Sequence, residues 1–346
     1  MFVITLLVLL CCTSLFSFFE NEKISVKWLT FAIIVVLLTI MAGMRPIGID
    51  KDSMQYYGYF LGGAHEFVEY SFLIICGISE TLFSDVRGVF VIYALLAIPL
   101  KCYAFTRLSD DIFALLAVYI SYFYILHDLT QIRIGVSLAL VFFGFTFLIK
   151  GKYLIYTICV LIATIFQYSA VMGLMLLLFR NKELNVWKRW VLAILPFIAF
   201  STFLMNIDLI SLIPIEYIQD RLTLYEELRD SGIAGDEKVN LLNISVLLKL
   251  VVFYFLLWKY DIVKEKCAYL PILLKTFVFS YCCFGLFSFL PILAFRTSEF
   301  FCFVEIMMIP LIIYAIEPKS VGKLLVSLYA IGMFLLNTFY AELLTL

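Results

Sequence analysis

Long uninterrupted apolar stretches recur along this chain and restrict its fold more than any other feature. Many are close to the roughly 18–20 residues that a helix needs to cross a hydrocarbon core of about 30 Å. Of the 346 residues, 64% are hydrophobic and 15% are charged, whereas soluble domains average about 45–50% and about 25%. Because the stretches are continuous rather than alternating, a transmembrane β-barrel is excluded. The sequence predicts an all-α, polytopic transmembrane helix bundle.

We predict about twelve membrane spans within one integral membrane domain that covers residues 1–346. The segment 67–84 is set apart, because Glu69, Gly77 and Glu80 fall on one helical face and predict an amphipathic helix at the membrane interface. The long polar segment 206–242 is predicted to be an outer loop. The predicted spans are 2–19, 28–43, 88–106, 111–126, 132–149, 153–167, 168–179, 187–205, 243–258, 270–290, 299–316 and 321–340.

Basic residues are unevenly divided between the two sides of this topology. Fifteen of the 25 lysines and arginines, Lys101 among them, fall on one side and eight on the other, while Lys249 and Lys275 lie within spans. Since cytoplasmic loops are enriched in Lys and Arg, the richer side is predicted to be cytoplasmic and both termini to face outward. If 67–84 crosses the membrane fully, everything before it inverts.

The segment 127–180 carries polar groups at both ends of a predicted helical hairpin. Its spans 153–167 and 168–179 are short and must pair closely, with the turn between them on the outer side. Polar groups within membrane-length segments are costly and usually functional, although Gln and Ser also form hydrogen bonds between helices. The polar residues are Gln131, Arg133, Gln167, Tyr168 and Ser169.

Several arginines are expected on the outer side, where the charge bias makes them less common. Arg45 ends a span, Arg133 opens one, Arg296 precedes one, and Arg221 lies in the outer loop. Interfacial arginines can simply extend their side chains to the water. Together, however, they favour a bound anion, because planar guanidinium groups bind phosphate and diphosphate in a bidentate manner.

No cofactor is predicted. Asp50 and Asp52 match a short Asp-x-Asp pattern of metal-using sugar transferases, but no histidine or acidic partner accompanies them. The nine cysteines lie mostly in apolar runs without metal-ligand spacing, so they are interpreted as small core residues. The net charge of −1 does not favour a nucleic-acid partner.

Three blocks of residues resemble the EpsG family of Wzy-like O-antigen or exopolysaccharide polymerases. The match is good over 41–60 and 127–180, and elsewhere it rests on hydropathy. One departure is Gln167, because the family usually has histidine there and glutamine cannot accept a proton at neutral pH. The blocks are Arg45, Gly48, Asp50, Tyr56 and Phe60; Gln131, Arg133 and Gly135 with the later Lys152-Tyr153-Leu154 turn; and Arg296 with Phe300 and Phe301.

The resemblance implies a glycan polymerase of the bacterial inner membrane with an outward-facing active site. Such an enzyme transfers a polyprenyl-diphosphate-linked glycan onto a lipid-linked repeat unit, without a metal, and a chain-length regulator protein is a possible partner. The predicted catalytic residues are Asp50 as base, with Asp52 as the alternative, and Arg133 and Arg296. These two arginines and Arg45 are the expected ligands of the diphosphate. The predicted substrate-binding residues are Arg45, Asp52, Tyr56, Gln131, Gln167, Tyr168, Ser169 and Arg221.

Two other functional classes remain open at this stage. A flippase for lipid-linked glycans should show charged groups at several mid-span positions, often with broken helices. An outer-face ligase or an acyltransferase is the second alternative. For the acyltransferase, His127 beside Asp128 is the only candidate histidine.

Overall fold

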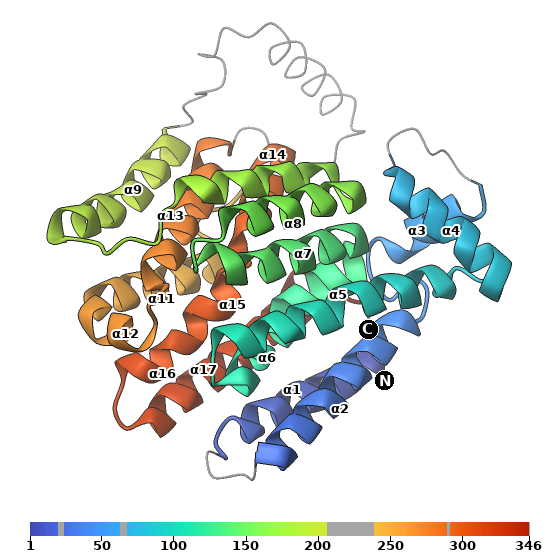
Figure 1. The fold of residues 1–346 in the computed structure, drawn as a ribbon, viewed down its shortest axis with the longest axis horizontal. Helices are drawn as coiled ribbons and strands as arrows, with labels where there is room; N and C mark the ends of the chain where they lie inside the picture. Colours follow the sequence, from blue (N-terminus) through green and yellow to red (C-terminus); the bar gives the residue numbers. More distant parts are fainter. Residues whose placement is uncertain (20–23, 63–67, 206–238, 289–290, 346) are drawn as a thin grey trace, which may run out of the picture.

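The protein is described here from a computed structural model that covers residues 1–19, 24–62, 68–205, 239–288 and 291–345. Within these ranges every regular element is a helix, and one isolated antiparallel bridge joins Asp50 to Leu344. The predicted all-α bundle is confirmed (Figure 1). Much of the predicted outer loop 206–242, including Arg221, lies outside the described residues.

Most helices coincide with the predicted apolar spans, but the helices Ser53–Phe60 and Tyr260–Lys266 lie outside them, and the helix Pro291–Cys302 contains Arg296, which was predicted to precede a span. In the first half they are α1 (Phe2–Phe16), α2 (Ile24–Gly43), α3 (Ser53–Phe60), α4 (Tyr70–Phe83), α5 (Arg87–Leu108), α6 (Ile112–Val118), the π-helix η1 (Tyr119–Thr130), α7 (Ile132–Leu148), α8 (Tyr153–Phe166) and the 3₁₀-helix η2 (Tyr168–Leu178). In the second half they are α9 (Val186–Leu204), α11 (Ile244–Trp258), α12 (Tyr260–Lys266), α13 (Leu270–Leu286), α14 (Pro291–Cys302), α15 (Glu305–Met308), η3 (Ile309–Leu311), α16 (Ile312–Ala315), α17 (Lys319–Leu335) and η4 (Leu336–Tyr340).

The predicted number of spans is not confirmed. Among the described residues, six helical segments are long and apolar enough to cross a membrane. Shorter apolar helices of 10–17 residues occupy the other predicted positions. The six long segments are Ile24–Gly43, Arg87–Leu108, Ile112–Thr130, Val186–Leu204, Leu293–Ala315 and Lys319–Tyr340.

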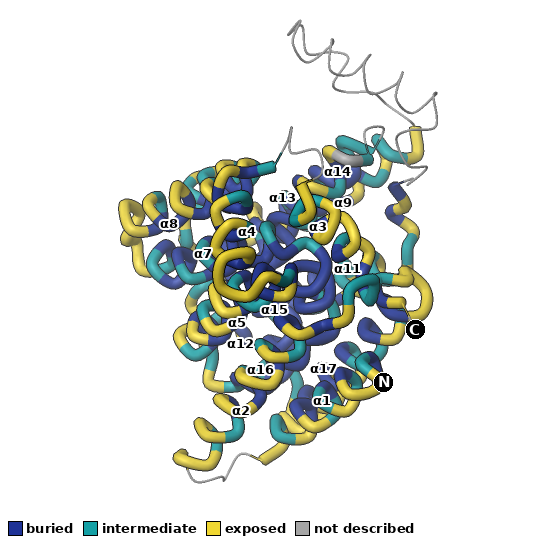
Figure 2. The backbone as a smooth tube through the Cα atoms, turned by 90° about the vertical axis from the view of Figure 1, so that its right-hand side faces the viewer, coloured by how far each residue is buried: buried dark blue, intermediate teal, exposed yellow. Residues whose placement is uncertain are grey.

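The segment Ile112–Thr130, formed by α6 and η1, is the centre of the bundle. Of its most apolar 18 residues 94% are buried, whereas in α2 at the periphery the share is 17% and a largely apolar surface is exposed. In Figure 1, α5, α7 and α8 are layered beside it, with α1 and α2 along one side and α9 and α11–α13 on the other. Figure 2 shows the same division, with buried helices inside and exposed turns outside.

The segments predicted to share the cytoplasmic side meet at one end of the bundle. Lys27 donates to the Asp110 carbonyl oxygen at 2.7 Å, and Asn181 donates to that of Ala268 at 3.2 Å. Lys101 is an exception to the predicted distribution. It is 3% exposed and lies inside the bundle, so it adds nothing to the charge of that end.

The predicted hairpin and interfacial helix are both present as helical elements. Helix α8 turns at Gln167 and η2 runs back along it, with the Tyr156 hydroxyl donating to the Gly173 carbonyl oxygen at 2.6 Å. Helix α4 packs against the N-terminal end of α5 and the C-terminal end of α8. Glu69, expected on its polar stripe, instead precedes the helix and is 2% exposed.

Candidate functional site

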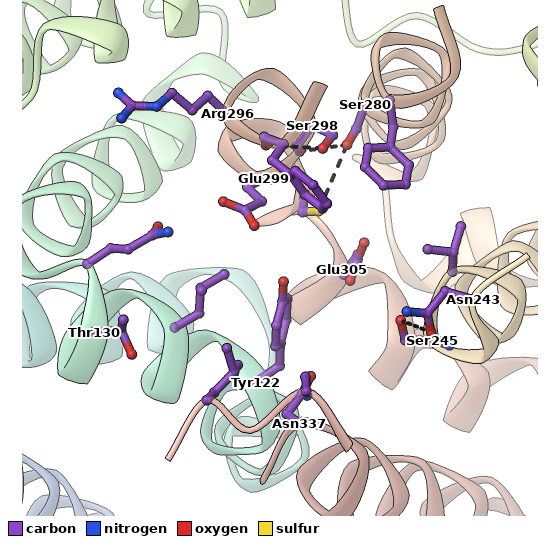
Figure 3. Close-up of a pocket in the computed structure, with 18 of the residues that line it drawn as sticks. Tyr122, Thr130, Asn243, Ser245, Ser280, Arg296, Ser298, Glu299, Glu305 and Asn337 are labelled. Carbon is purple, nitrogen blue, oxygen red and sulfur yellow. Dashed lines mark hydrogen bonds between the residues drawn. The ribbon is translucent and has the colours of Figure 1, made fainter. Parts of the chain in front are cut away.

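A large pocket lies among the ends of several helices. Its volume is about 1000 Å³, and its walls come from the loop before α3, from η1, α11, α13, α14 and α15, and from the C-terminal segment. Figure 3 shows Thr130, Tyr122, Glu299, Glu305 and Asn243 around this common space. Segments separated by most of the chain therefore build one cavity.

One face of η1 forms a wall of the pocket. Tyr122, Leu126 and Thr130 recur at four-residue spacing and all line the cavity. Gly135 of α7 packs against the end of η1, and a Cβ added there would lie 2.2 Å from the His127 carbonyl oxygen. A glycine is therefore required for this close contact between helices, which fixes the position of the wall.

Three of the predicted site residues meet at the pocket. Asp52 comes from the loop after α2, Gln131 from the junction of η1 and α7, and Arg296 from α14. Arg296 is exposed, and Figure 3 shows it near one edge of the drawn pocket residues. This arrangement combines a carboxylate, an amide and a guanidinium group, which suits a ligand that carries both hydroxyl groups and negative charge.

The carboxyl group of Asp52 is suited to proton transfer. Burial is the main cause that raises its pKa from 3.8 to about 6, and the nearby Asp50 carboxylate raises it further. Arg133, Lys51 and Arg45 act in the opposite direction. A general base works best when its pKa lies near the operating pH, and Asp52 comes close to this condition.

Asp50 and Arg45 do not line the pocket. Arg45 Nε lies 2.9 Å from Asp50 Oδ2, and both side chains are completely buried. Arg45 Nη1 also donates to the Ala42 carbonyl oxygen at 2.8 Å, and the guanidinium group lies 3.8 Å from the centre of the Phe90 ring. Asp50 Oδ1 accepts two backbone N–H groups of the following turn at 2.9 and 3.1 Å. The pair therefore fixes the loop that carries Asp52.

Arg133 lies beside the pocket rather than in its wall. It forms an ion pair with the buried Glu69, and the Tyr56 side chain lies next to it. Glu69 also accepts the backbone N–H of Tyr168 at 3.4 Å. The two polar ends of the predicted hairpin therefore meet each other through Glu69, a residue that the sequence did not suggest as their partner.

The remaining predicted substrate-binding residues that the structure describes are not part of the pocket wall. Tyr56 is 3% exposed and packs against Phe72 and Phe90. Gln167 is buried at the end of α8, and Tyr168 is 62% exposed. Neither they nor Ser169 line the cavity.

Sequence reasoning missed an ion pair that lines the pocket. Lys249 Nζ lies 3.0 Å from Glu305 Oε2, with side-chain exposures of 11% and 4%. Lys249 was recognised as a charge within a span, but its partner was not. The available signal was Glu305 itself, an acidic residue inside the apolar run 299–316.

Several neutral polar groups of the pocket were also missed. Amides and hydroxyls alternate with aromatic rings around the cavity, a combination that can bind sugar hydroxyls and pack against sugar faces. Asn243 was hard to assign from sequence, because the same side chain caps α11 by accepting the Ser245 N–H at 3.1 Å. The polar residues are Asn240, Asn243, Ser245, Ser280, Ser298 and Asn337, and the rings include Tyr122, Phe277, Tyr281, Phe284 and Phe295.

A second buried cluster lies away from this cavity. Lys101 Nζ contacts the two carboxylate oxygens of Asp128 at 2.7 and 2.8 Å, and the Tyr119 hydroxyl donates to Asp128 at 2.5 Å. His127 is 1% exposed and does not line the pocket. The acyltransferase alternative, which needs an accessible His127, gains no support from this position.

Among the described residues, no cluster of three or more His, Cys, Asp or Glu side chains is arranged to hold a metal ion. The apolar helices and the polar pocket at one end define a polytopic membrane protein with a large polar cavity. The profile of the EpsG family matches residues 28–344, and the chain belongs to this family, a family of Wzy-like polymerases. Searches of curated proteins and of solved structures gave no significant match.

Proposed function

We propose that this protein is a polysaccharide polymerase that transfers a polyprenyl-diphosphate-linked glycan onto a lipid-linked repeat unit. Membership of the EpsG family supports a Wzy-like polymerase. The observation that carries the specific reaction is the pocket, which brings Asp52 and Arg296 together with amide and aromatic side chains. A carboxylate, a cation and a sugar-binding wall are the groups that glycosyl transfer from a diphosphate requires.

In the proposed reaction, Asp52 accepts the proton of the acceptor hydroxyl as this oxygen attacks the anomeric carbon. The bond from that carbon to the diphosphate oxygen breaks, and the oxygen keeps the electron pair. Arg296 stabilises the charge that develops there, and Gln131 is among the groups that bind sugar hydroxyls. Arg133 acts from beside the pocket, where its charge already lowers the pKa of Asp52.

This assignment moves the catalytic base from Asp50 to Asp52. Asp50 is buried and its oxygens are already bound, whereas Asp52 lines the pocket. The same reasoning removes Arg45 from the diphosphate ligands, because its guanidinium group is held by Asp50. Glutamine at position 167 is then compatible with activity, since the proton acceptor lies elsewhere.

We further propose a bacterial cytoplasmic membrane location with the pocket on the outer side. Lys51, Asn240 and Arg296 all line the pocket and belong to segments predicted to face outward. The basic segments meet at another end of the bundle, as described above. The exposed apolar faces of the helices would contact the polyprenyl chain and membrane lipids.

The test is complementation of a deletion strain, with polymer length read from a gel. Asp52→Asn and Arg296→Ala should each lower the rate of polymerisation by about 10²-fold or more and leave single-repeat lipid caps. Asp110→Asn and Arg180→Ala are matched controls, because both residues are exposed and neither lines the pocket. If both pocket variants are present at normal protein levels and give polymer of normal length, the proposal is refuted.

A flippase is the second candidate, and two observations favour it over the acyltransferase. The segment 291–315 is divided into α14, α15, η3 and α16, and charged pairs lie at Lys101–Asp128 and Lys249–Glu305. Purified protein in vesicles separates the two reactions. Movement of a lipid-linked repeat across the bilayer without any lengthening would favour the flippase.

A further inference from the structure

The Lys249–Glu305 pair has properties that a purely structural ion pair does not require. It joins α11 to α15 and lines the cavity, with Nζ and Oε2 3.0 Å apart. Buried ion pairs contribute little net stability, because removing two charges from water offsets their attraction. Ionised side chains within membrane segments are usually functional.

The contacts of the pair leave capacity for a ligand. Oε2 of Glu305 lies in the ion pair but receives no hydrogen bond of good geometry. The Lys249 ammonium has three N–H donors, and its second neighbour is the Tyr122 ring, whose centre is 4.7 Å away. A ring face stabilises the positive charge without accepting a conventional hydrogen bond. The ammonium group is thus held in place without being saturated.

The depth of Lys249 suits the phosphates of a membrane-anchored donor. It is five residues beyond Ile244, the first residue of α11, which corresponds to about 8 Å along the helix axis. The headgroup region of a bilayer is several ångströms thick on each side of the hydrocarbon core. A diphosphate tethered to a polyprenyl chain would reach this depth, with its sugars in the wider pocket.

We propose that Lys249 is a catalytic residue that binds the diphosphate of the donor. This inference rests on the proposed glycosyl transfer. As the anomeric C–O bond breaks, the electron pair passes to the diphosphate oxygen, and the Lys249 ammonium donates a hydrogen bond to that oxygen while keeping its protons. Glu305 positions the ammonium and competes with the diphosphate for it. Low exposure strengthens the attraction between Lys249 and the diphosphate relative to that of the exposed Arg296.

A binding measurement on the full-length protein in lipid nanodiscs tests this role, with inorganic diphosphate as the probe. Lys249→Met should weaken binding by about tenfold or more, whereas Glu305→Gln should tighten it, because the competing carboxylate is gone. Lys275→Met is the matched control, since this lysine also lies in an apolar helix but donates to the Arg180 carbonyl oxygen elsewhere. It should bind the probe as the wild type does.

A structural ion pair predicts a different pattern, with both single variants less stable and diphosphate binding unchanged or equally weakened. Unchanged diphosphate binding in Lys249→Met, or equally weakened binding in both variants, overturns the role of Lys249. The variant Glu305→Gln keeps the test decisive if Lys249→Met does not fold, because only competition predicts tighter binding. Thermal unfolding of each variant is measured alongside.

Polymerisation of a lipid-linked repeat by the same preparations separates this inference from the function on which it rests. Lys249→Met should lower the turnover rate more than the apparent affinity for the acceptor. If the wild type lengthens the glycan and Lys249→Met does so equally well, the inference fails and the function stands. If the wild type binds diphosphate through Lys249 but never lengthens the glycan, the anion site stands and the polymerase function fails.

Discussion

Replacing Asp50 by alanine should destabilise the protein rather than remove a catalytic group. The change leaves the Arg45 guanidinium group completely buried and without its carboxylate partner. It also removes the acceptor for two backbone N–H groups of the next turn. Loss of one partner from a buried ion pair costs about 3–5 kcal/mol, and we expect a decrease of this size in the free energy of unfolding.

The assay is unfolding in mixed micelles by titration with dodecyl sulfate, followed by the fluorescence of the four tryptophans. Asp52→Ala is the matched control, because it removes a carboxylate two residues away. Burial disfavours the charged form of Asp52, so its loss should change stability little while lowering polymerisation by about 10²-fold or more. The double variant Arg45→Met/Asp50→Leu should recover much of the lost stability, since no unpaired charge remains.

The two single variants should therefore separate stability from activity. Asp50→Ala should be less stable but should retain turnover in the fraction that is folded at low temperature. An Asp50→Ala protein with wild-type stability and no turnover would refute this reasoning and return Asp50 to the reaction.

Three further predictions concern the pocket and its supports. Asp52 must be ionised to act as a base, and its pKa is raised to about 6. The rate of polymerisation should therefore fall about tenfold per pH unit below pH 6, as measured in a pH–rate profile. The residual activity of Asp52→Asn should not show this decrease. Gly135→Ala should lower stability by roughly 1–3 kcal/mol, because its methyl group would meet the His127 carbonyl oxygen; wild-type unfolding would contradict the close contact. Deleting residues 343–346 should loosen the loop that carries Asp52, since Thr345 bonds to Ile49 and Gly48 at 2.8 and 2.6 Å; faster hydrogen exchange at 48–53 is the expected result, and unchanged exchange would exclude this support.

The sequence alone determined the fold class, the positions of most apolar helices and the family. An apolar run of membrane length is a local property, so its position can be read without knowledge of its neighbours. The motif around Arg45, Gly48 and Asp50 is equally local, and it pointed to the EpsG family that the profile match then showed. The number of spans was not fixed in this way, because α8 and η2 are shorter than a full crossing.

Only the tertiary structure decided which polar residues share a site, because pairing depends on packing between segments far apart in the chain. Asp50 was predicted to be catalytic and Arg45 to bind substrate, but Asp50 and the Phe90 ring enclose the Arg45 guanidinium group. Glu305 was one acid in an apolar run until α11 brought Lys249 to it. A buried charge requires a partner, and the sequence shows this requirement without showing which residue meets it.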